Sequence, residues 1–129
     1  MNDDYLCRAL VVDDNKLERD LIKALLLELG AEIVGEAENG EEAIQAFNEL
    51  KPDISFLDIR MPVKNGIDAL KEIIKKDPNA IVVMLTAVSE TDIADSCIDL
   101  GAKKYVRKGT SPAIMTIMLQ AGLDFVGTV

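Results

Sequence analysis

The sequence predicts an α/β fold in which five short parallel strands alternate with five amphipathic helices. Two observations carry this prediction. Short apolar runs recur along the 129 residues, and each is followed by a longer stretch with apolar residues at helical spacing. No repeat, low-complexity tract or linker interrupts the alternation, and one domain usually has roughly 100–200 residues. We therefore expect a single domain that occupies residues 1–129.

The first half of the chain is expected to contain three strands and two helices. The strands are predicted at residues 9–12, 33–34 and 54–57. The first helix should span residues 17–29 and end at Gly30. Its apolar face would comprise Leu17, Leu21, Ala24 and Leu25. The second helix should begin after an Asn39 cap, and its apolar face would comprise Ala43, Phe47 and Leu50.

The second half is expected to add three helices and two strands. The third helix ends before Asp77, and its apolar residues are Ile67, Leu70, Ile73 and Ile74. Strands are predicted at residues 81–85 and 105–106. Between them, Ser89 should cap a fourth helix that ends at Gly101. Ser111 and Pro112 form a typical helix start, so the last helix should run from Pro112 to about residue 126.

The apolar character of the strands predicts how these elements are arranged. Nearly continuous apolar strands indicate a parallel sheet that is covered on both faces. Right-handed crossovers then give a doubly wound fold, for which we predict the flavodoxin-like strand order 2-1-3-4-5. In such sheets the ligand binds beyond the carboxyl ends of the strands.

Composition and charge exclude several classes of function. Fourteen Lys and Arg residues against 23 Asp and Glu residues give a net charge of −9, which argues against direct nucleic-acid binding. The chain contains no His, which excludes Ser-His-Asp catalysis and phosphohistidine chemistry within it. Cys7 and Cys97 are too far apart in sequence for a CxxC site and are expected to be free thiols. The absence of a signal peptide and of a membrane-length apolar run predicts a soluble, cytoplasmic protein without membrane contact.

Polar residues end four of the five predicted strands. Asp13 and Asp14 follow the first strand, Asp58 follows the third, Thr86 follows the fourth and Lys108 follows the fifth. Since the first and third strands are neighbours in the predicted order, the three carboxylates should crowd together. Each residue also has an ordinary interpretation: Asp13 or Asp14 as a helix cap, Asp58 as a turn residue and Lys108 as a solvated charge.

Crowded carboxylates favour a bound cation. Like charges 4 Å apart repel by roughly 4 kcal/mol at an effective dielectric of about 20. Hard oxygen ligands without His or Cys indicate Mg²⁺. A carboxylate beside Mg²⁺ and Lys108 is well placed to attack phosphorus and form an aspartyl phosphate. Lys108 and the Thr86 hydroxyl would then stabilise the phosphoryl oxygens.

The motifs at these strand ends resemble the receiver domain of bacterial two-component response regulators. They are Val12-Asp13-Asp14, Leu57-Asp58-Ile59-Arg60-Met61-Pro62, Leu85-Thr86-Ala87 and Tyr105-Val106-Arg107-Lys108, and the resemblance covers nearly the whole chain. It implies that Asp58 accepts a phosphoryl group from a sensor histidine kinase or phosphotransfer protein. It further implies that Asp13, Asp14, Asp58 and the Arg60 carbonyl hold Mg²⁺, that Lys108 contacts the phosphoryl group, and that Thr86 and Tyr105 form a switch. The signal would pass to a downstream effector or output domain.

One departure from the family pattern is Gly109, which stands where the family usually has a proline joined by a cis bond. A cis bond before glycine costs about 2.5–4 kcal/mol, so the Lys108–Gly109 bond should be trans. The alternative function is a receiver-like interaction module that works without phosphorylation. A haloacid-dehalogenase phosphatase is a weaker alternative, because Asn15-Lys16 follows Asp14 in place of the Asp-x-Asp motif.

The last helix is apolar on more than one side. Ile114, Ile117, Met118 and Ala121 share one face and are expected to cover the sheet. Met115 and Leu119 recur on another face with Gly122 and Val126, and we expect this face to bind a partner or a second copy of the chain. The alternative is a broad contact with the core. The sequence does not distinguish a stand-alone protein from one domain of a longer regulator.

Overall fold

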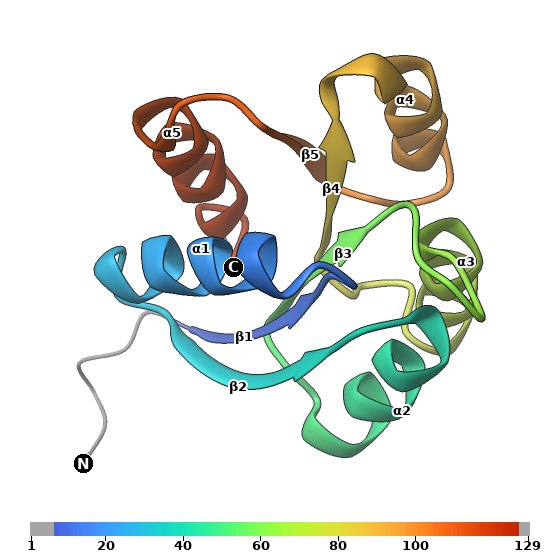
Figure 1. The fold of residues 1–129 in the computed structure, drawn as a ribbon. Helices are drawn as coiled ribbons and strands as arrows, with labels where there is room; N and C mark the ends of the chain where they lie inside the picture. The colour runs from blue at the N-terminus through green and yellow to red at the C-terminus, as the bar shows by residue number, and fades with distance from the viewer. Residues whose placement is uncertain (1–6, 127–129) are drawn as a thin grey trace, which may run out of the picture.

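A single parallel sheet with strand order β2-β1-β3-β4-β5 forms the centre of the molecule (Figure 1). The structure is a computed structural model, and it describes residues 7–126. The strands are β1 (Arg8–Val12), β2 (Glu32–Ala37), β3 (Ile54–Asp58), β4 (Val82–Ala87) and β5 (Lys104–Lys108). The predicted α/β class, parallel sheet and strand order are confirmed.

Helices cover both faces of the sheet, as Figure 1 shows. They are α1 (Lys16–Glu28), α2 (Gly40–Leu50), α3 (Gly66–Lys76), α4 (Thr91–Asp99) and α5 (Pro112–Leu123), with a short 3-10 turn, η1 (Val88–Glu90), before α4. Two apolar clusters lie on opposite faces. One joins α1 and α5 to the sheet around Val11 and Phe56. The other joins α2, α3 and α4 to the sheet around Leu10 and Leu57.

Side-chain caps begin four of the five long helices. Asn15, Asn39, Asn65 and Ser111 each accept a hydrogen bond from the backbone N–H three residues later, at 2.9–3.3 Å. The predicted caps at Asn39 and Ser111 are confirmed. The predicted cap at Ser89 is wrong, because Ser89 lies inside η1 and α4 begins only at Thr91.

The buried face of α1 differs from the prediction. Leu17, Leu21 and Ala24 are exposed, whereas Ile22, Leu25 and Leu26 are buried. The helix carries leucines on both stripes, so helical spacing alone does not identify the inner one. The stripe that packs against β1 and α5 is the one that also places Arg19 over the end of β1.

The buried face of α5 differs from the prediction, although Met118 does pack against the core. Met115 and Leu119 are 2% and 0% exposed, whereas Ile117 is 70% exposed and Ile114 is 47% exposed. Gly122 favours this orientation, because α5 lies so close to the sheet that a Cβ there would be 3.1 Å from a Val83 methyl group. Met115 and Leu119 are therefore core residues and are not a partner surface. The helix also ends at Leu123, before the predicted residue 126.

The loop after β5 takes a path that glycine favours. No cis peptide bond occurs within the described residues, so the Lys108–Gly109 bond is trans, as predicted. Gly109 has φ +86°, a left-handed conformation that proline cannot adopt.

Among residues 7–126, no helix combines the length and the apolar character needed to cross a membrane.

Candidate functional site

Three carboxylates meet at the carboxyl edge of the sheet. β1 and β3 are hydrogen-bonded neighbours, so Asp13, directly after β1, lies beside Asp58 at the end of β3. Asp13, Asp14 and Asp58 each offer an oxygen atom, and these atoms lie within 4.8 Å of one another. Asp13 and Asp58 are buried, and Asp14 is exposed. The structure thus brings together the carboxylates that the sequence analysis selected.

Lys108 reaches this cluster from the end of β5. Its Nζ lies 2.9 Å from Asp13 Oδ2 and 3.2 Å from Asp58 Oδ1. A third carboxylate, that of Glu18 on α1, lies closer still, at 2.6 Å. Burial lowers the pKa of the Lys108 ammonium, but hydrogen bonds to Glu18 and Asp13 and the charge of Asp58 outweigh it, so the pKa is raised. Lys108 is therefore a permanent cation in the site.

The electrostatic environment of Asp58 disfavours its charged form. Burial raises the pKa of the Asp58 carboxyl from its usual 3.8 to about 7, because the opposing effect of Lys108 is smaller and the charges of Asp13 and Asp14 act in the same direction as burial. One lysine does not offset three carboxylates. A further cation at this position would favour the ionised Asp58 that a nucleophile requires.

Arg19 holds Asp13 in place from the buried face of α1. Its guanidinium Nη1 donates a hydrogen bond to the main-chain carbonyl of Asp13 at 2.6 Å, while Nε donates to Glu36 on β2 at 2.7 Å. The Asn15 N–H donates to Asp13 Oδ1 at 2.9 Å. Together these contacts fix both the backbone and the carboxylate of Asp13.

Arg19 and Glu18 are residues of the site that the sequence pattern did not identify. Their signal was weak, because each sits within a helix whose apolar pattern leaves two candidate inner faces. The sequence does place Arg19 three positions before Ile22, and this spacing puts the two residues on the same face of the helix.

Thr86 and Tyr105 lie on neighbouring strands and on the same face of the sheet. Met84 pairs with Tyr105 and Thr86 pairs with Arg107, so alternation along β4 and β5 places the Thr86 and Tyr105 side chains on one side. Thr86 is fully buried, and its hydroxyl donates to the Ala87 carbonyl at 3.2 Å.

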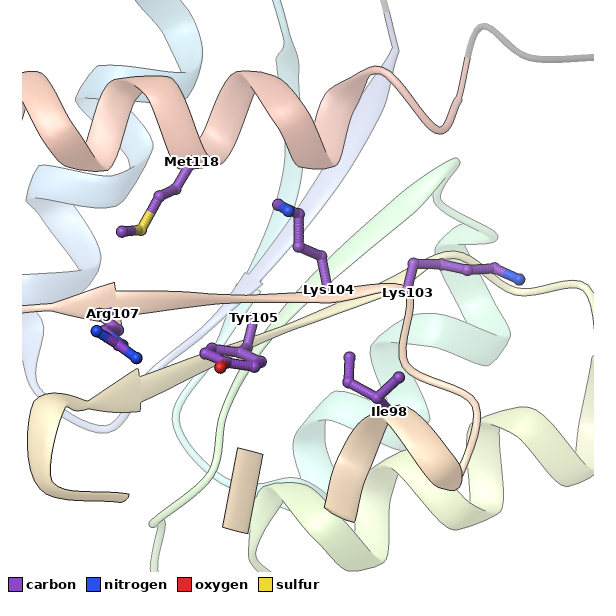
Figure 2. Close-up of a pocket in the computed structure, with 6 residues that line it drawn as sticks. All are labelled: Ile98, Lys103, Lys104, Tyr105, Arg107 and Met118. Carbon is purple, nitrogen blue, oxygen red and sulfur yellow. The ribbon is translucent and has the colours of Figure 1, made fainter. Parts of the chain in front are cut away.

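Tyr105 lies in a hollow between α4 and α5. The hollow has a volume of about 370 Å³, and Figure 2 shows the Tyr105 ring with Ile98 of α4 and Met118 of α5 along its walls. Three cations, Lys103, Lys104 and Arg107, also line it. Tyr105 is partly buried against the α3–α4 side of the core.

Arg60 stands two residues beyond Asp58 in the sequence. The side chain is 71% exposed and forms an ion pair with Glu90 in η1. The role of the Arg60 main-chain carbonyl as a metal ligand stays a prediction.

The donor set of the site fits a hard divalent cation. Three carboxylates with no His or Cys among the candidate ligands are typical of Mg²⁺ or Ca²⁺ sites, and Mg²⁺ commonly uses one or two carboxylates together with water and phosphate oxygens. The exposure of Asp14 leaves a path by which water and a phosphorylated donor can enter. The cluster can therefore bind a metal ion beside a carboxylate nucleophile.

Comparisons with known proteins agree with this geometry. The model of the response regulator receiver domain family matches residues 9–120. Chemotaxis protein CheY of Thermotoga maritima is 43% identical over 106 residues, which cover 82% of this chain and 88% of that protein. The solved response regulator domain of Thermotoga maritima CheB aligns with a TM-score of 0.84 and 31% identity, over 95% of this chain and 97% of that one. A chain of the solved CheX–CheY–BeF3–Mg complex from Borrelia burgdorferi aligns with a TM-score of 0.81 and 30% identity, over 88% of this chain and 87% of that one.

Proposed function

Because the chain belongs to the response regulator receiver domain family, we propose that Asp58 is its phosphoacceptor and that phosphorylation of Asp58 sets its signalling state. The observation that supports this most strongly is the meeting of three carboxylates and Lys108 at the carboxyl edge of the sheet. The protein promotes only its own phosphorylation and dephosphorylation. Its receiver domain occupies residues 1–129, and it works in the cytoplasm with a sensor histidine kinase or phosphotransfer protein.

The phosphoryl step uses a carboxylate oxygen of Asp58 as the nucleophile. This oxygen forms a bond to phosphorus while the P–N bond of the partner's phosphohistidine breaks, and the electron pair of that bond stays on the departing imidazole nitrogen. Lys108, 3.2 Å from Asp58 Oδ1, is placed to donate to the transferred phosphoryl oxygens. Mg²⁺, when held by Asp13, Asp14, Asp58 and the Arg60 carbonyl, supplies the positive charge that offsets these carboxylates and the phosphoryl group.

Phosphate uptake from a small donor tests this proposal. After incubation with Mg²⁺ and acetyl phosphate, the intact protein should gain the mass of one phosphoryl group, and Asp58→Asn should gain none. Asp92→Asn, the same change on the exposed side of α4, is the matched control and should be modified like the wild type. A wild type that takes up no phosphoryl group, or an adduct that survives in Asp58→Asn, would favour the alternative of an interaction module that works without phosphorylation.

Phosphorylation is expected to act through Thr86 and Tyr105. The phosphoryl group adds strong acceptors near Asp58, the Thr86 hydroxyl turns toward them, and Tyr105 moves inward into the space that Thr86 leaves. This movement changes the surface formed by α4, β5 and α5, which binds the downstream effector, output domain or a second copy of the chain. Since Met115 and Leu119 are buried, the exposed Ile114 and Ile117 are the large apolar residues that α5 offers to such a partner.

Tyrosine fluorescence can follow this switch directly. The chain has no Trp and two Tyr residues, so Tyr5→Phe leaves Tyr105 as the only fluorophore of this kind. In that background, phosphorylation should reduce quenching of Tyr105 by acrylamide, because the ring becomes more buried. Adding Thr86→Ala should preserve phosphorylation by intact mass but remove the change in quenching. An unchanged response in Thr86→Ala would show that Tyr105 does not depend on the threonine.

A further inference from the structure

Glu18 forms the shortest contact that Lys108 makes in the site. The Glu18 Oε1 atom lies 2.6 Å from Nζ, compared with 2.9 Å for Asp13 Oδ2 and 3.2 Å for Asp58 Oδ1. Glu18 lies in the first turn of α1, where the Asn15 cap fixes its backbone. Its side chain is 45% exposed, whereas that of Lys108 is 11% exposed, so Glu18 is the more solvated partner of this ion pair.

Lys108 donates hydrogen bonds to Asp13 and Glu18 and forms an ion pair with Asp58. An ammonium group has three N–H donors and no acceptor. To contact a phosphoryl group on Asp58, Lys108 must direct at least one N–H donor toward the phosphoryl oxygens. The phosphoryl oxygens must therefore compete with Asp13 and Glu18 for the ammonium.

Asp13 and Glu18 differ in how readily they can release Lys108. Asp13 is fully buried and is held by Asn15 and Arg19. Glu18 is half exposed and extends from a helix surface beside a hollow of about 180 Å³, which is lined by Leu21, Ile22, Thr110 and Met115. A long, partly solvated side chain can exchange its ion pair for water at little cost. Glu18 is therefore the contact that can be given up.

Resting on the proposed function of Asp58, we propose that Glu18 is a positioning residue that restrains Lys108 toward α1 and so slows phosphorylation. Its carboxylate competes with the incoming phosphoryl oxygens for the ammonium. Its charge also adds to the three carboxylates that a negatively charged phosphodonor must approach. Both effects have the same sign, so removing the contact should make the phosphorylated state easier to reach.

Two variants of Glu18 separate the contact from the charge. Glu18→Gln removes the charge at the same length, whereas Glu18→Asp keeps the charge but is one methylene too short to hold Lys108 at 2.6 Å. Asp20→Asn is the matched control, since it makes the same charge change on α1 at a residue that pairs with Lys16 and Lys23.

Two readouts test the proposal with Mg²⁺ in excess. The rate of phosphoryl uptake from acetyl phosphate is followed by intact mass, and the affinity for beryllofluoride, which mimics a phosphoryl group on a carboxylate, by ¹⁹F NMR. Glu18→Gln should raise both about fivefold, the size expected for the loss of one partly exposed ion pair. Glu18→Asp should raise both in the same direction, and Asp20→Asn should leave both within about twofold of wild type.

Several outcomes would overturn the proposal. The first is a Glu18→Gln variant that takes up the phosphoryl group no faster than wild type, or no faster than Asp20→Asn. The second is a Glu18→Asp variant whose uptake rate and beryllofluoride affinity equal those of wild type. If wild type itself takes up no phosphoryl group, both the proposed function of Asp58 and this inference fail. If wild type is phosphorylated and only the Glu18 variants behave unexpectedly, the inference fails while the proposed function of Asp58 stands.

A double-mutant cycle in EDTA reports the contact without metal or phosphate. The unfolding free energies of Glu18→Gln, Lys108→Met and the double variant should be non-additive. The same cycle with Asp20→Asn should be additive. Additive behaviour of Glu18 and Lys108 would contradict the restraint, whatever the phosphorylation rates.

Discussion

Replacing Asp58 with Asn should stabilise the metal-free protein strongly at pH 8 and only slightly at pH 4.5. Burial and the neighbouring carboxylates raise the pKa of Asp58 from 3.8 to about 7 in the folded state. Between these two values the folded protein holds a proton that the unfolded chain has released, so the stability of wild type falls as the pH rises from about 4 to about 7. The amide side chain of the Asp58→Asn variant carries no charge to desolvate and avoids this loss.

The size of the effect follows from the shift. One pKa unit corresponds to about 1.4 kcal/mol, so the gain in unfolding free energy from Asp58→Asn should be about 1 kcal/mol at pH 4.5 and about 2–4 kcal/mol at pH 8. Urea unfolding in EDTA at the two pH values measures it. Asp92→Asn, on the exposed side of α4, should show no such gain.

Saturating Mg²⁺ should reduce or reverse this difference at pH 8. A ligand that binds only the folded state adds RT ln(1 + [L]/Kd) to the unfolding free energy, and wild type keeps all three carboxylates while Asp58→Asn lacks one. The gain from Mg²⁺ should therefore be larger for wild type. If Asp58→Asn is no more stable than wild type at pH 8 in EDTA, ionised Asp58 does not destabilise the folded protein. Equal gains from Mg²⁺ would exclude Asp58 as a ligand.

The sequence was sufficient to predict the fold and the centre of the site. Strand ends are defined by where apolar runs stop, and parallel strands bring all their carboxyl ends to one edge. Asp13, Asp58 and Lys108 therefore converge for a reason that the sequence contains. The trans bond at Gly109 was predicted because the cost of a cis bond is a local property of the peptide.

The sequence was insufficient where a helix has two apolar stripes. In α5, both Met115 and Ile114 belong to such a stripe, and the choice depends on how closely the helix approaches the sheet at Gly122. The same ambiguity in α1 hid Glu18 and Arg19, whose partners lie on other elements, at Lys108 and at the Asp13 carbonyl. Contacts of this kind depend on which side of the helix faces the sheet. Hydrophobic periodicity does not determine that side when the helix has more than one apolar stripe.

Gly66→Ala should destabilise the protein far more than a single methyl group usually does. A Cβ at Gly66 would lie 2.1 Å from the main-chain oxygen of Asp58 and 2.9 Å from its carbonyl carbon. These are backbone atoms at the end of β3, and they cannot rotate away as a side chain can. The N–H of Gly66 also donates to the Ile59 carbonyl at 2.8 Å, which fixes the start of α3 against this strand. Relief of the overlap requires α3 to move away or the phosphoacceptor backbone to shift.

Gly109→Ala provides the matched control, because it adds the same methyl group where nothing lies within 4 Å. Its cost should be about 1 kcal/mol, which comes from the positive φ alone. We expect Gly66→Ala to lose about 3 kcal/mol or more in urea unfolding, at the upper end of the cost of overpacking. If the variant retains measurable stability, it should also take up phosphate from acetyl phosphate more slowly, because the Asp58 backbone is displaced. A loss no greater than that of Gly109→Ala, with normal phosphate uptake, would mean that β3 and α3 can separate without disturbing Asp58.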